Sequence, residues 1–148
     1  MKFPLFFPAL LLAAMLMTEG LHAQDFVAKL VYARNQPPQE KSDPGLDPAL
    51  LKKIEKTFGY KYHRIAAQAR SPITKYTADF PRLGQDFSLK IEELGHQDGK
   101  YRLRINLFHK NKSLLETTVD FRKDVPLLIR GPFYDQGELI LVIEMTDK

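Results

Sequence analysis

Apolar and polar residues alternate along three consecutive segments in the second half of the chain, at residues 87–94, 100–110 and 113–121. A period of two residues is typical of β-strands that bury one face and solvate the other. The sequences between these segments suit tight turns, since Asp98-Gly99 tolerates positive φ angles and Asn111-Lys112 is short and polar. We therefore predict an antiparallel meander of three strands.

Residues 139–143 differ from this pattern, because Leu-Ile-Leu-Val-Ile is apolar at every position. Successive side chains of a strand point to opposite faces, so Ile140 and Val142 face away from Leu139 and Leu141. Burial of side chains of this size contributes roughly 1.5–3 kcal/mol each, so an exposed face is unfavourable. Either a second layer covers Ile140 and Val142, or the two form an exposed patch that docks a partner.

Residues 48–58 form the clearest predicted helix and can supply that second layer. Asp47 can cap the first turn, Pro48 suits the first helical position, and Gly59 suits a left-handed stop. One face of this helix is apolar and consists of Leu50, Leu51, Ile54 and Phe58. We expect this face to lie on the sheet, over the outer side of the last strand.

Further strands are predicted at residues 25–34, 60–69, 74–80 and 125–130. The segment 131–137, with two glycines and a proline, is expected to bend between strands. The predicted fold class is α+β and mostly β, an antiparallel curled sheet or sandwich of about seven or eight strands with one packed helix. Residues 24–148 are expected to form a single domain, in which the polar, proline-containing loop at 35–46 is a spacer or a binding loop.

The first 23 residues have the layout of a secretory signal peptide. Lys2 precedes an apolar stretch from Phe3 to Met17, which is shorter than the about 20 residues that cross a bilayer. Small Ala23 stands before the predicted cut, and Gly20 offers a second cleavage position. We therefore expect an exported protein, periplasmic or extracellular, that keeps no transmembrane span after cleavage.

Composition argues against several chemistries. The chain has no cysteine, and its four histidines lack the spacing of a zinc site. It also lacks a phosphate-binding glycine loop and a Gly-x-Ser-x-Gly motif. We therefore expect no cofactor, no metal and no catalytic residues. The net charge of +4 is modest, and together with export it disfavours nucleic acid as a partner.

Two groups of residues form the candidate binding face. Lys90, Arg102 and Arg104 alternate with apolar residues on neighbouring predicted strands, so they can share one cationic sheet face. Tyr60 and Tyr62 could stack on a sugar or a peptide. A cationic face would attract anionic lipid or polysaccharide. The ordinary alternatives are a solvated strand face for the cations and core or edge positions for the tyrosines.

Two motifs carry a resemblance to known proteins, namely Leu51-x-x-Ile54-x-x-x-Phe58-x-Tyr60 and Gly131-Pro132-x-Tyr134-x-x-Gly137-x-Leu139-Ile140-Leu141. Together with the arginine-rich middle strand, they resemble small exported bacterial proteins of an uncharacterised β-rich family, over most of residues 46–146. The resemblance implies the β-rich architecture and export. It implies no activity.

Two functional hypotheses follow from these observations. In the first, the protein is a non-enzymatic envelope protein, either a binding module or an accessory subunit of a larger assembly, with another envelope protein as its partner. In the second, it is a small periplasmic hydrolase or isomerase with a dispersed active site that would use His63 or Asp98. The lack of a catalytic motif favours the first hypothesis.

Overall fold

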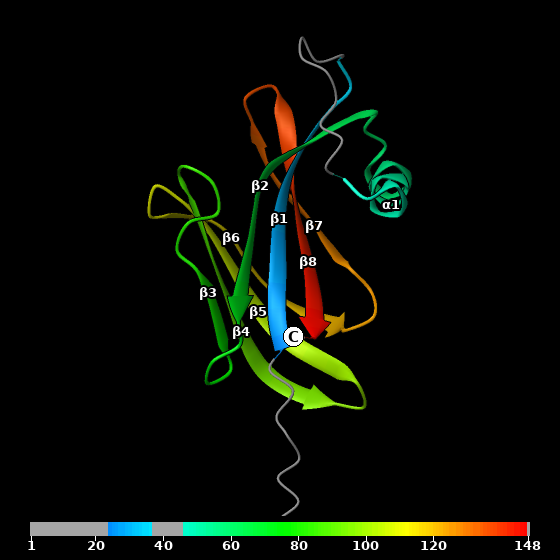
Figure 1. Ribbon diagram of the computed structural model, residues 1–148. Helices are drawn as coiled ribbons and strands as arrows, with labels where there is room; N and C mark the ends of the chain where they lie inside the picture. The colour runs from blue at the N-terminus through cyan, green and yellow to red at the C-terminus, as the bar shows by residue number, and fades with distance from the viewer. Residues whose placement is uncertain (1–23, 37–45, 148) are drawn as a thin grey trace, which may run out of the picture.

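The computed structural model describes residues 24–36 and 46–147. The predicted signal peptide and residues 37–45 of the predicted loop lie outside the described residues. The described chain forms eight strands and one helix (Figure 1), in the order β1 (Gln24–Arg34), α1 (Pro48–Phe58), β2 (Tyr62–Pro72), β3 (Thr77–Phe80), β4 (Phe87–Gln97), β5 (Lys100–His109), β6 (Lys112–Arg122), β7 (Leu127–Tyr134) and β8 (Gly137–Asp147).

The strands form two antiparallel four-stranded sheets, with the orders β2-β1-β8-β7 and β3-β4-β5-β6. Strand β2 lies next to β3, and β6 lies next to β7, so the strands follow their chain order around one core. The predicted fold class, a mostly β sandwich with one helix, is confirmed. The meander predicted from the period-two segments corresponds to β4, β5 and β6.

The space between the two sheets holds the main hydrophobic core. Phe26 and Phe121 meet edge to face there, with ring centroids 5.9 Å apart. Strand β8 contributes every second residue to this core, namely Leu141, Ile143 and Met145. This spacing is the one expected for a strand whose inner face is buried.

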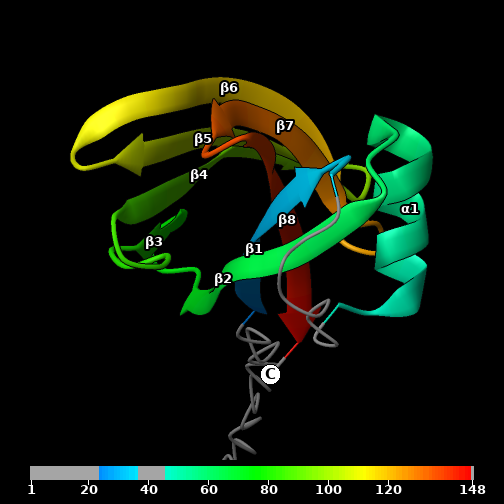
Figure 2. The same ribbon diagram turned by 90° about the horizontal axis from the view of Figure 1, so that it is seen from above.

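A second apolar cluster lies on the outer face of the β2-β1-β8-β7 sheet, beneath α1 (Figure 2). Ile140 and Val142 of β8 are fully buried in this cluster, together with Leu50 and Ile54 of α1. The prediction that the helix covers the far side of the last strand is therefore confirmed. The alternative, an exposed patch at Ile140 and Val142, is wrong.

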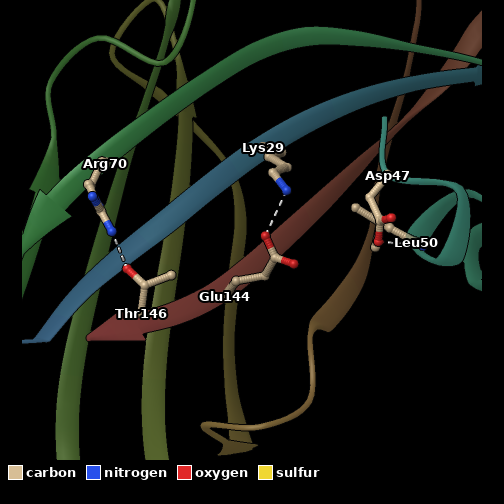
Figure 3. Close-up of polar contacts among 6 residues, drawn as sticks. All are labelled: Lys29, Asp47, Leu50, Arg70, Glu144 and Thr146. Carbon is tan, nitrogen blue, oxygen red and sulfur yellow. Dashed lines mark hydrogen bonds and ion pairs between the residues drawn. The ribbon is translucent and has the colours of Figure 1, made fainter. Parts of the chain in front are cut away.

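The predicted capping residues set both ends of α1. The Asp47 carboxylate accepts a hydrogen bond of 3.3 Å from the Leu50 amide (Figure 3), and Pro48 occupies the first turn. Gly59 adopts a φ of 76°, and its amide donates to the Glu55 carbonyl at 2.8 Å. A left-handed residue at this position ends the helix while satisfying one of its last carbonyls.

The outer face of the same sheet becomes polar where it leaves the apolar cluster. Glu144 and Thr146 continue the outward register of Ile140 and Val142 along β8. Lys29 Nζ lies 2.7 Å from Glu144 Oε2, and Arg70 donates to the Thr146 hydroxyl at 2.6 Å (Figure 3). The change from apolar to polar residues on one strand face therefore marks the edge of the area that α1 protects.

The prediction that residues 131–137 bend between strands holds only for Asp135 and Gln136, which form the turn between β7 and β8. It is wrong for the residues before them, because β7 continues through Gly131 and Pro132 to Tyr134. The pairing with β8 shifts between Arg130 and Phe133, which is the mark of a β-bulge. Strand β7 is the last strand of its sheet, so the missing N–H of Pro132 need not cost a ladder hydrogen bond. A Cβ at position 131 would lie 2.8 Å from the Leu139 carbonyl oxygen, so only glycine fits there.

Strand β2 begins at Tyr62, so Tyr60 lies before the strand rather than within it. No helix among the described residues has the length and apolar character needed to span a bilayer.

Candidate functional site

The predicted cationic face lies on the outer side of the β3-β4-β5-β6 sheet, where its residues pair with carboxylates. Glu92 contacts both Lys90 Nζ, at 3.2 Å, and Arg104 Nη1, at 3.6 Å. Arg102 Nε lies 3.2 Å from Asp120 Oδ1. The structure therefore brings the three predicted cations onto one surface, where each already has an acidic neighbour.

Neither predicted tyrosine joins this face, because Tyr62 begins β2 of the other sheet and Tyr60 lies just before that strand. Tyr60 donates its hydroxyl hydrogen to Glu138, whose side chain is only 3% exposed and whose Oε1 lies 2.9 Å from Arg130 Nε. The hydrogen bond to Glu138 raises the pKa of Tyr60, with burial and the carboxylate charge acting in the same direction and Arg130 opposing them. Tyr62 is half-buried and pairs with Arg34 of β1. Tyr60 therefore has a structural role at the end of α1.

His63 and Asp98, the residues of the enzyme hypothesis, lie at opposite ends of the sandwich. His63 pairs with Ala33 near the end of β1. Asp98 lies in the turn before β5, where Tyr101 bonds to Gln24 at the start of β1. These two side chains cannot share one active site.

His63 is nevertheless unusual, because it is only 8% exposed and its Nε2 has no hydrogen-bond partner among the described residues. Its register partner Ala33 belongs to the cluster beneath α1. Burial lowers the pKa of His63 below 6.5, and Glu55 of α1 opposes this shift. A histidine that resists protonation in the folded state makes stability depend on pH.

We expect the free energy of unfolding to fall as the pH drops below about 6.5, because the unfolded chain then binds a proton that folded His63 resists. The loss continues until the pH passes the lowered folded-state pKa. Replacing His63 by methionine should remove this part of the pH dependence. Urea unfolding of both proteins between about pH 7.5 and pH 5 measures it. Parallel stability profiles for the two proteins would contradict the assignment.

The end of the sandwich where β1, β3, β5 and β7 terminate carries a different arrangement of charge. Four acidic residues lie at this end, Asp86 and Asp135 in the β3–β4 and β7–β8 connections and Asp79 and Glu138 close to the ends of their strands, while Asp47 caps the helix. Six basic residues lie in its connections or close to its strand ends, namely Arg34, Lys61, Arg64, Arg82, Lys110 and Lys112. We call this group the basic end.

These six basic residues are free of salt bridges. The described part of the chain contains nine ion pairs, and none of them involves one of these six basic residues. Two of the pairs, His109–Asp86 and Arg130–Glu138, lie at the same end. Five of the six residues are exposed, and Arg34 is half-buried. Because the predicted cationic face is paired and the basic end is not, the basic end is the stronger candidate for binding an anion.

Aromatic contacts connect the two sheets at this end. The Tyr134 ring of β7 lies 5.6 Å from Phe87 and 5.7 Å from His109, which belong to the opposite sheet. On the other side, Tyr32 donates its hydroxyl hydrogen to the Asp135 carbonyl of the β7–β8 turn. These contacts tie the β7–β8 turn to β1 and to the opposite sheet.

Two of the arginines share one aromatic ring. The guanidinium carbons of Arg64 and Arg34 lie 5.5 Å and 5.9 Å from the centroid of Tyr32. Cation–π attraction holds each charge in place. It does not cancel the repulsion between them, so an anion that binds both would be stabilised at this position.

The β7–β8 hairpin places apolar surface beside these charges. Phe133 is 82% exposed, the most exposed large apolar side chain of the described residues, and Tyr134 is 41% exposed. The sequence pattern does not predict this combination. Phe133 was assigned to a bend, and the basic residues are dispersed between positions 34 and 112, so no local motif marks them.

No group of three or more His, Asp or Glu side chains that could hold a metal occurs among residues 24–36 and 46–147. Comparisons with known proteins found no matching family model, no matching curated protein and no matching solved structure. Interpretation of the site therefore rests on its own geometry.

Proposed function

We propose that this chain is an exported, non-enzymatic binding module that takes an anionic partner of the cell envelope at its basic end. The observation that carries the proposal is the contrast in ion pairing. Carboxylates contact Lys90, Arg102 and Arg104 on the sheet face, whereas no carboxylate pairs with the basic end in the described part of the chain. Unpaired cations keep their full attraction for an external anion.

The N-terminal pattern supports the envelope location. Residues 1–23 have the charge, apolar length and small residue before the cut that secretory signal peptides share. Export of a cysteine-free chain requires a fold that is stable without disulfides. The two apolar clusters, between the sheets and beneath α1, supply that stability.

The test is binding of polyglutamate, a soluble polyanion, to protein purified after export, with its N-terminus determined by mass. We expect affinity to fall as the salt concentration rises from about 50 mM to about 300 mM, because screening weakens exposed charges. Reversing two charges in the variant Lys110→Glu/Lys112→Glu should lower affinity by about tenfold or more. Fluorescence anisotropy with labelled polyglutamate measures both effects.

Two matched variants locate the site. Lys75→Glu/Lys100→Glu reverses two exposed lysines at the opposite end of the sandwich, and Arg102→Glu/Arg104→Glu reverses the paired face. Both should retain affinity within about twofold, because charges beyond a Debye length of about 10 Å are screened. Loss of binding in the arginine variant alone would move the site to the paired face. Absence of binding by the wild-type protein would refute the proposal.

A further inference from the structure

Building on the proposed function, we infer that the anionic partner is the phospholipid surface of a membrane, and that Phe133 inserts into it. The basic end then supplies electrostatic attraction to the headgroups, and the β7–β8 hairpin supplies an apolar anchor. Three observations support this: the spread of the basic end over one end of the sandwich, the exposure of Phe133, and the contacts that hold the β7–β8 hairpin.

The six basic residues are spread widely across the end of the molecule. The β5–β6 turn, with Lys110, and the start of β2, with Lys61 just before it, lie on opposite sides of this end (Figures 1 and 2). A small anion could contact only one side of such an arrangement. An extended anionic surface can contact several of these residues at once, and each Lys or Arg near an anionic bilayer adds to the attraction.

The exposure of Phe133 favours a bilayer over an acidic protein as the partner. Its ring is 82% exposed and lies one residue before Tyr134, on a hairpin that projects from the same end of the sandwich (Figure 1). A single projecting aromatic side chain enters a fluid interface without needing a preformed pocket, whereas a protein partner would need one. Exposed aromatic residues and cations at one end of a protein are typical of surfaces that bind at membrane interfaces. Asp135, exposed on the same turn, opposes the attraction to an anionic surface.

The hairpin is held firmly enough to present this side chain. Tyr32 bonds to the Asp135 carbonyl, and a Cβ added at Gly137 would lie 2.5 Å from the Tyr32 ring, so ring and backbone are in close contact. Tyr134 is fixed on the other side by Phe87 and His109. Phe133 therefore projects from a supported turn, and little ordering entropy is lost when it binds.

The experiment is co-flotation of the exported, processed protein with vesicles. We expect binding to vesicles of phosphatidylcholine and phosphatidylglycerol, and weak binding to phosphatidylcholine alone. Lys110→Glu/Lys112→Glu should reduce binding by about tenfold or more, because two of the basic residues are lost. Phe133→Ser should reduce vesicle binding by about tenfold, because its ring no longer leaves water. The same variant should leave polyglutamate binding unchanged.

The matched control is Tyr76→Ser, which removes an aromatic ring that is 69% exposed at the opposite end. It should bind vesicles as the wild-type protein does. Equal losses for Tyr76→Ser and Phe133→Ser would overturn the assigned orientation. Binding of polyglutamate without binding of anionic vesicles would overturn the membrane inference and leave the proposed function standing. Absence of both would overturn both.

Discussion

Replacing Ile54 by alanine is expected to lower the free energy of unfolding by about 2–5 kcal/mol, the range for removing a large aliphatic side chain from a packed core. Ile54 lies on the inner face of α1 and is completely buried, in the cluster that also holds Ile140 and Val142 of β8. The substitution leaves a cavity between helix and sheet, and the alanine itself favours the helix. Urea unfolding followed by circular dichroism measures the change.

Thr57→Ala is the matched control, because Thr57 lies on the exposed side of the same helix. It should change the stability by no more than about 0.5 kcal/mol. If Ile54→Ala were as mild as Thr57→Ala, the helix would not stabilise the sheet, and the two-sided burial of β8 would lose its explanation.

Replacing Arg130 by methionine is expected to cost about 2–3 kcal/mol. The substitution removes the cation that lies 2.9 Å from Glu138, whose carboxylate is almost fully buried. Breaking a fully buried pair costs about 3–5 kcal/mol, because the remaining charge is uncompensated, but Arg130 is more than half exposed and water can replace part of its effect. Methionine keeps an unbranched stem near Phe58, over whose ring the guanidinium lies.

Adding Glu138→Gln to Arg130→Met should restore most of the lost stability. The glutamine removes the unpaired charge and still offers an amide oxygen to the Tyr60 hydroxyl. A thermodynamic cycle over the wild-type, the two single variants and the double variant measures the coupling energy. Additive single costs would show that Glu138 does not depend on Arg130, and the cluster at the end of α1 would need another explanation.

Contacts along its length and at its C-terminal end give α1 a defined position on the sheet. Apolar contacts through Leu50 and Ile54 hold the helix on the sheet. At its C-terminal end, Tyr60 and Phe58 both contact the cluster formed with β7 and β8, through Glu138 and Arg130 respectively. His63, in β2, is buried near the same helix. Acid pH and substitutions at this end are therefore expected to loosen the helix before the inner core between the sheets.

The sequence determined the features that depend on neighbouring residues. Period-two alternation identified β4, β5 and β6, and Asp47, Pro48 and Gly59 set the ends of α1. The apolar run in β8 required cover on both faces, and the predicted helix had an apolar face that could provide it. These inferences succeeded because side-chain direction in a strand, helix capping and the cost of exposing apolar surface are all local properties.

Only the tertiary structure decided which charges are paired. Lys90, Arg102 and Arg104 look like a cationic strip in sequence, yet Glu92 reaches Arg104 and Asp120 reaches Arg102 across neighbouring strands. Lys90 pairs with Glu92 along its own strand. The basic end is the reverse case, since its residues come from three connections and three strand ends spread over nearly eighty positions. Sheet topology alone brings them to one side. Ion pairing depends on distance in space, which the order of residues along the chain does not contain.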